Sequence, residues 1–298
     1  MFQNFDTLLK KIPTGKTKES RLLSTAIVLF LLVFAPALIA DVLKLLFIDQ
    51  PVGTPITSIL ATIFLAPPAF LIGSYLTQTP WQVFILPPKR MALQVFGGIA
   101  LGLALASILA LALIVTGVLG FEFVFVQGYV MGMWLEGIYC IAWGVFVCSL
   151  LCGVMLPVLI KQFQSKIQAC AAIVIFAILF VLLSYFSQGN IFLTLMLTIN
   201  AGLGAYVILM LYMQTGSLLF TSLSLSFFLW GIADVYGSSY LGQNFSEALF
   251  ATPALSKVSY ISGAPYGMEA SIVLTALLAA LAWFLSVRFF KNEQDASK

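Results

Sequence analysis

The chain has 298 residues, of which 61% are hydrophobic and 8% are charged. A soluble protein of this length needs many more polar side chains to cover its surface, so the composition excludes a water-soluble globular domain. The net charge of +3 gives no indication of a nucleic-acid partner. The chain contains no histidine, which removes the commonest general base and the commonest metal ligand.

About eight stretches are apolar over the roughly 20 residues that a helix needs to cross a bilayer. They lie at 22–48, 55–76, 93–118, 130–160, 168–187, 191–213, 217–238 and 269–290. We therefore predict an all-α fold, a polytopic transmembrane helical bundle that forms a single domain over residues 22–290. Residues 1–21 are a basic segment that could form an interfacial helix, and residues 291–298 are a short tail.

The positions of lysine and arginine predict the orientation of this bundle. Most of them lie before the first span, between spans two and three, between spans four and five, and after the last span. If the N-terminus is cytoplasmic, all of these segments face the cytoplasm, and only Lys44 and Lys257 lie on the other side. Both termini are therefore expected in the cytoplasm, in a bacterial inner membrane, with a thylakoid or another internal membrane as the alternative.

Small residues occur at helical spacing in two of the spans. Gly98 and Gly102 are followed by further small residues in span 93–118, and Gly202 and Gly204 lie in span 191–213. Small residues let helices approach closely, so both faces are expected to pack within the chain. Dimerisation through these faces is the alternative.

Ionisable side chains inside spans are costly, so each one suggests a functional site. Glu136 and Asp234 lie within the spans 130–160 and 217–238, and Trp230 precedes Asp234 by one helical turn. We expect these three residues to line a groove or to bind a partner. A polar rim beside Asp234 is expected from Tyr236, Ser238, Ser239 and Tyr240.

Other polar residues have simpler interpretations. Asp41 and Lys44 are three residues apart near the end of the first span and are expected to pair. Glu269 stands at the predicted start of the last helix, where a carboxylate complements the helix dipole. Cys148 and Cys152 share a helix face, but two thiols without histidine partners do not make a metal site. No metal or cofactor is predicted.

Several stretches from span four onward follow one another in a recognisable order. They are Val147–Gly153 with Leu156-Pro157 after it, a Phe-x-x-x-Ser from Phe180 to Ser184, the turn Gln214-Thr215-Gly216-Ser217-Leu218, and the Gly-rich stretch Ser262–Ser271. In order and spacing they resemble the CPBP family of CAAX proteases and bacteriocin-processing proteins. The resemblance covers roughly residues 90–290, and it implies a glutamate intramembrane protease-like bundle.

The residues that carry the chemistry of that family are replaced in this chain. Its glutamates and arginine fall on Val147, Cys148 and Cys152, and its first histidine falls on Ser184. Its last histidine and asparagine fall on Leu225 and Leu229, or one residue later on Ser226 and Trp230. Peptide hydrolysis needs groups that activate water and protonate the leaving amine. The resemblance therefore implies a pseudoprotease rather than an enzyme.

Three functions are consistent with this sequence. The preferred one is a non-catalytic subunit that assists, assembles or scaffolds another integral membrane protein, held in the former protease groove. The first alternative is a transporter or permease for a small molecule or ion that uses Glu136 and Asp234. The second is a membrane enzyme of unrelated chemistry, which needs both carboxyls to converge with the hydroxyls of the polar rim.

Overall fold

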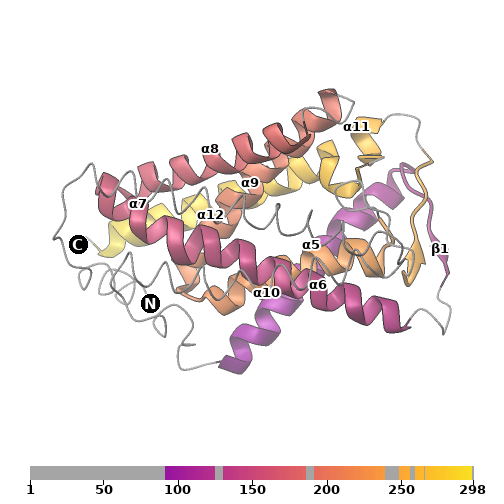
Figure 1. The fold of residues 1–298 in the computed structure, drawn as a ribbon, viewed down its shortest axis with the longest axis horizontal. Helices are drawn as coiled ribbons and strands as arrows, with labels where there is room; N and C mark the ends of the chain where they lie inside the picture. Colours follow the sequence, from indigo (N-terminus) through magenta and orange to yellow (C-terminus); the bar gives the residue numbers. More distant parts are fainter. Residues whose placement is uncertain are drawn as a thin grey trace, which may run out of the picture.

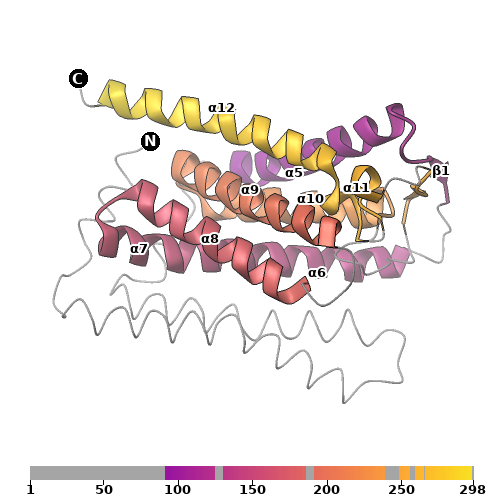
Figure 2. The ribbon, with the colours of Figure 1, turned by 90° about the horizontal axis from the view of Figure 1, so that it is seen from above.

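The structure is a computed structural model that describes residues 91–124, 130–185, 191–238, 248–255, 259–264 and 266–296. Long helices dominate this part, and most of them run roughly along the longest axis of the molecule (Figures 1 and 2). Five of the helices are long and apolar enough to cross a membrane. The prediction of an all-α membrane bundle is thereby confirmed. The predicted spans 22–48 and 55–76, the N-terminal segment and the Asp41–Lys44 pair lie outside the described residues.

The helices begin and end close to the predicted spans. In chain order they are α5 (Met91–Val115), α6 (Val130–Cys148), η2 (Ser149–Met155), α7 (Leu156–Phe163), α8 (Lys166–Tyr185), α9 (Ile191–Thr215), α10 (Leu218–Trp230), η3 (Gly231–Val235), α11 (Ser259–Ser262), η4 (Met268–Ala270) and α12 (Ile272–Ala296). The apolar stretch of α8, Lys166–Leu182, is shorter than the five candidate spans. A span at 168–187 is therefore a prediction that helix length does not establish.

The fourth span is one long helix, α6 through α7, with a π-helical segment, η2, in its middle. Pro157 is the second residue after η2 and has no N–H to donate to the carbonyl four residues earlier, which disturbs the α-helical ladder. The amide of Leu156 donates to the carbonyl of Leu151, five residues back, as in a π-helix. Ser149 adds to the distortion because its hydroxyl donates to the carbonyl of Val145 at 2.5 Å.

Helices α5 and α10 pack at very short distance through the predicted small-residue face. A Cβ atom added to Gly98 would lie 2.7 Å from the carbonyl oxygen of Phe220. One added to Gly102 would overlap the carbonyl oxygen of Ser224. The expected intramolecular packing of these glycines is confirmed. The same expectation is confirmed for Gly202, which packs against α8, and is wrong for Gly204, around which an added Cβ meets nothing within 4 Å.

Helix α9 is tied to the start of α12 by a buried amide. The Asn200 side-chain nitrogen donates to the carbonyls of Glu269 and Ser271 at 2.8 and 3.0 Å. Its oxygen accepts a 2.7 Å hydrogen bond from the Thr275 hydroxyl. The helix begins at Ile272 rather than at the predicted residue 269, because Ser271 caps it by accepting from the Leu274 amide. Glu269 lies in the preceding short helix η4.

The two ends of the bundle differ in character. At one end, α7 meets α8 near Lys166, and the far end of α12 carries Arg288 and Lys291 (Figures 1 and 2). At the other end, β1 (Glu122–Phe123) pairs antiparallel with β2 (Phe250–Ala251). We call these the α7 end and the β1 end. The gathering of basic residues at the α7 end agrees with the loop assignment made from the sequence.

Candidate functional site

The candidate site lies where α6 and η3 meet, and a regular antiparallel register between α6 and α10 builds it. The Ser222 hydroxyl interacts with the Cys148 thiol. One turn further along α10, Ser226 donates to the carbonyl of Ile141 at 3.3 Å and lies against Gly144. One turn forward along α10 therefore moves the contact one turn back along α6, as expected for two antiparallel helices in close contact.

This register continues to the charged residues. A Cβ atom added to Gly137 would lie 3.1 Å from the indole nitrogen of Trp230. The next turn carries Asp234 in η3, an element that also packs against α6. The Cys140 thiol, one turn from Glu136, is close enough to interact electrostatically with both carboxyls. The structure therefore places Glu136, Asp234 and Trp230, the three residues that the sequence grouped as one site, along the same contact between α6 and α10–η3.

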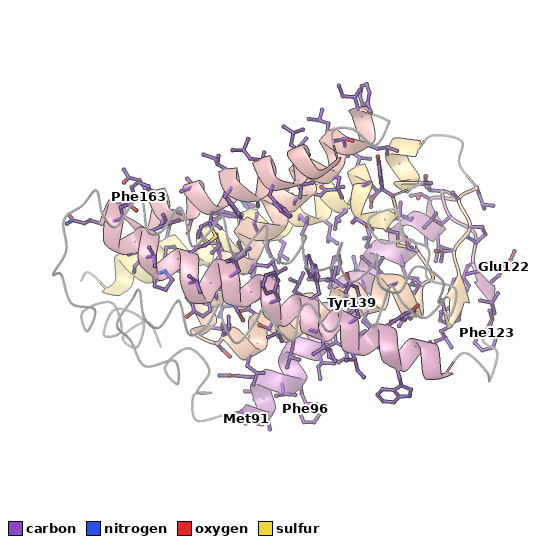
Figure 3. All side chains as sticks on the ribbon, viewed as in Figure 1. Met91, Phe96, Glu122, Phe123, Tyr139 and Phe163 are labelled. Carbon is purple, nitrogen blue, oxygen red and sulfur yellow. The ribbon has the colours of Figure 1, made fainter. Side chains whose placement is uncertain are left out.

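The acid pair lies inside the bundle rather than at its surface. Asp234 is fully buried and Glu136 is 8% exposed. Glu136 is six residues into α6, which places it about 9 Å along the helix axis from Val130. Tyr139, one turn further along α6, is labelled in Figure 3. Within the described residues, the Trp230 indole nitrogen is buried without a hydrogen-bond partner, against Gly137 of α6.

The polar rim expected beside Asp234 is engaged in structural hydrogen bonds. The Tyr236 hydroxyl donates to Ser107 on α5 at 2.9 Å. The Ser238 hydroxyl accepts from the Met268 amide at 3.0 Å. These hydroxyls hold the end of η3 to α5 and η4, because they already have partners on those elements. Both carboxyls of the third candidate function lie within electrostatic reach of Cys140, but these two hydroxyls serve the fold, and Ser239 and Tyr240 lie outside the described residues.

The positions that the resemblance aligns with the CPBP catalytic motif are buried in this structure. Cys148 and Cys152 are both fully buried, and Val147 packs partly buried against the same core. Cys152 lies near Cys148, near Cys170 on α8 and near Tyr212 on α9. Because η2 starts at Ser149, the two thiols are not separated by a regular α-helical turn as the sequence suggested. The described residues include no group of three potential ligands that could hold a metal ion.

The two alternative pairs of positions for the last motif face different neighbours. Ser226 is fully buried and bonds to α6, and Trp230 lies against Gly137 of the same helix. Leu225 instead packs on the apolar core, and Leu229 is buried at 6% exposure. The positions that face α6 are therefore Ser226 and Trp230. Ser184 belongs to α8, and its side chain lies outside the described residues.

Sequence reasoning missed Gly137, Cys140 and Gly144 as part of the site. They form, with Cys148, a row of small residues on α6 at spacings of three and four. A matching row at a spacing of four, Ser222, Ser226, Trp230 and Asp234, lies on α10 and η3. Two such rows predict close packing of the helices that carry them. Pairing the rows would have placed Glu136 and Asp234 along the same helix contact.

Comparisons with known proteins assign this chain to no family. A scan against protein-family models, a search of curated proteins and a search of solved structures each found no match. The fold and the apolar helices define a helical integral membrane protein. Its interior contains two buried carboxyls, those of Glu136 and Asp234, and a group of buried thiols, those of Cys148, Cys152 and Cys170.

Proposed function

We propose that this chain is a non-catalytic, CPBP-like membrane protein that binds another integral membrane protein as an accessory, assembly or scaffold subunit. The observation that carries the proposal is the complete burial of Cys148 and Cys152 in the stretch that resembles the catalytic motif. Neither thiol has access to water or substrate, and both are packed by side chains of neighbouring helices. Such a stretch suits a structural core better than a site of hydrolysis.

The same burial changes where a partner would bind. Because the chain itself fills the interior around Cys152, a partner helix has no room there. The adjoining face of α6 offers an exposed apolar stripe at Trp134, Ile138 and Ile141, which are 70%, 47% and 38% exposed. Their spacing of four and three residues presents one side of the helix, as an apolar helix–helix contact requires. The proposed partner lies along this stripe.

Site-specific photocrosslinking in the native membrane tests this contact. With p-benzoylphenylalanine in place of Ile138, we expect irradiation to give one discrete adduct of higher mass. A lipid-facing residue gives no such band, because lipid adds little mass. The matched control is the same replacement at Phe284 on α12, which is 59% exposed. No adduct at residues 134 and 138, or the same adduct at residue 284, would contradict the proposal.

The proposed membrane is a bacterial inner membrane, with both termini in the cytoplasm. This assignment is supported by the basic residues at the α7 end, Lys166, Arg288 and Lys291, since cytoplasmic segments carry an excess of lysine and arginine. The α7 end would then face the cytoplasm and the β1 end the opposite side. A thylakoid or another internal membrane is the alternative.

A second candidate function is transport of protons or a small cation. It is favoured by the convergence of Glu136 and Asp234 on Cys140 in the bundle interior. Two carboxyls buried in a membrane are costly unless a proton, a cation or hydrogen bonds compensate their charge. The π-helical segment that carries Asp234 is a further feature that often accompanies functional sites.

Flux measurements with purified protein in liposomes test the second candidate. If the pair carries protons or cations, Glu136→Gln and Asp234→Asn each reduce flux to the rate of empty liposomes, because each removes one carboxyl at nearly unchanged volume. The matched control is Glu122→Gln, which neutralises an exposed carboxyl in β1 and should leave flux unchanged. Wild-type flux in both site variants, or no flux in the unsubstituted protein, would exclude this function.

A further inference from the structure

Beyond the acid pair, the β1 end carries an aromatic cluster with a large exposed surface. Phe121 and Phe123 flank the ring of Phe250, with ring centroids 4.5 and 5.6 Å away. On the same ring lies Tyr236, at 6.3 Å. Although they are packed together, Phe121 and Phe123 remain 50% and 67% exposed. We call these four residues the β1 aromatic cluster.

The cluster is held rigidly to the helices. The Tyr236 hydroxyl bonds to Ser107 of α5, and the Thr252 hydroxyl donates to the carbonyl of Tyr236 at 2.7 Å. The backbone amide of Gly120 donates to the carbonyl of Pro253 at 2.8 Å. The exposed rings are therefore presented by an ordered two-stranded element and do not hang from a free loop.

The cluster continues the apolar surface of α5. Exposed apolar residues at helical spacing, Ile108, Leu111 and Val115, lead along α5 to its end, where Val115 is 83% exposed. On a membrane-crossing helix this surface faces lipid, because α5 is one of the candidate spans. Phe121 follows only six residues after Val115. The aromatic rings thus lie just beyond the end of a lipid-facing stripe, at the depth where bilayers place aromatic side chains.

The polar residue within β1 fits the same placement. Successive side chains of a strand point to opposite faces, so Glu122 points away from the face shared by Phe121 and Phe123. Figure 3 labels Glu122 and Phe123 at the edge of the molecule, at the β1 end. A strand at a bilayer surface would turn its rings toward lipid and its carboxylate toward water.

We propose that the β1 aromatic cluster is a membrane-interface anchor, in which Phe121 and Phe123 insert into the lipid headgroup region while Glu122 faces water. In segments that lie at a bilayer surface, phenylalanine rings are buried at the boundary of headgroups and acyl chains while charged side chains stay in water. The anchor would fix the depth of the β1 end, and through Tyr236 it would fix the end of η3, two residues from Asp234.

Nitroxide accessibility in liposomes of phosphatidylcholine and phosphatidylglycerol tests the proposal. Phe123→Cys and the matched control Glu122→Cys are spin-labelled separately; the native cysteines, Cys140, Cys148, Cys152 and Cys170, are all buried. The unsubstituted protein gives the labelling background. We expect collisions with oxygen to exceed collisions with a water-soluble nickel chelate several-fold at residue 123, and the reverse at residue 122.

Two results would overturn the proposal. Equal access of the nickel chelate to residues 122 and 123 would put both side chains in water. Exclusion of both oxygen and the chelate at residue 123 would mean that protein covers the ring. Both positions are exposed, and the one ring contact that is lost is that of Phe123 with Phe250 at the surface. Size-exclusion profiles of the two variants should therefore match that of the unsubstituted protein.

Discussion

Gly102→Leu is expected to destabilise the bundle by about 3 kcal/mol or more, because it forces α5 and α10 apart. The atoms that a Cβ would meet are the carbonyl oxygen of Ser224 and the amide nitrogen of Phe228, the latter at 2.8 Å. Both are backbone atoms of a helix and cannot rotate away as a flexible side chain could. For a chain of this size the loss corresponds to roughly 6–12 °C in Tm.

The four buried cysteines provide the measurement. A fluorogenic maleimide reacts with them only as the protein unfolds, so heating in detergent with this reagent reports Tm. The control is Gly204→Leu on α9, the same exchange at a glycine where an added Cβ meets nothing within 4 Å. We expect its Tm to stay close to that of the unsubstituted protein or to rise, since leucine favours a helix over glycine. Equal losses in both variants would mean that close packing at Gly102 is not what holds α5.

The contrast between these glycines shows which helix contacts a sequence pattern predicts and which it does not. The apolar lengths predicted the helices from residue 91 onward, because crossing a bilayer sets a minimum run of apolar residues. The Gly98–Gly102 spacing predicted a packing face correctly. Gly204 lies two residues from Gly202, and therefore about 200° away around the helix, so both cannot face the same neighbour. Only one of them meets α8.

The π-helical segments were harder to predict. Pro157 signals that the ladder before it is disturbed, but a proline can produce a kink, a break or a wide turn. Which of these occurs depends on packing around η2, and there Cys148, Cys152 and Met155 are all buried. Without that packing the sequence suggested a regular helix with both thiols on one face.

The sequence identified the residues of the candidate site but not their arrangement in space. Glu136 and Asp234 stand out in any apolar chain because ionisable residues are rare inside spans. Their convergence depends on the pairing of α6 with α10, since separations of almost one hundred residues carry no local signal. The stretch that resembles the CPBP catalytic motif gives the converse case, since a groove was predicted there. The sequence shows that Cys148 and Cys152 are apolar enough to fill it, and only the contacts with α8, α9 and α10 reveal that they do.

Asn200→Leu is expected to destabilise the protein by about 2–4 kcal/mol, although leucine is similar in size and better suited to an apolar helix. The substitution removes two donors from the carbonyls of Glu269 and Ser271 and one acceptor from Thr275. Glu269 and Ser271 are buried and Thr275 is half-buried, so water replaces the lost partner poorly. The turn before α12 contains Gly263 and Gly267 at positive φ, a conformation that flexible glycines adopt readily. The hydrogen bonds from Asn200 therefore help to hold this turn in place.

Thermal unfolding with the same maleimide reagent measures the loss, and two variants identify its cause. Thr198→Val removes a buried hydroxyl that bonds only within α9, to the Thr194 carbonyl at 2.6 Å, and should cost less than about 1 kcal/mol. Asn200→Asp keeps the acceptor and loses both amide donors, so we expect it to be at least as unstable as Asn200→Leu. An Asp variant with the stability of the unsubstituted protein would show that the donors to Glu269 and Ser271 do not hold α9 against α12.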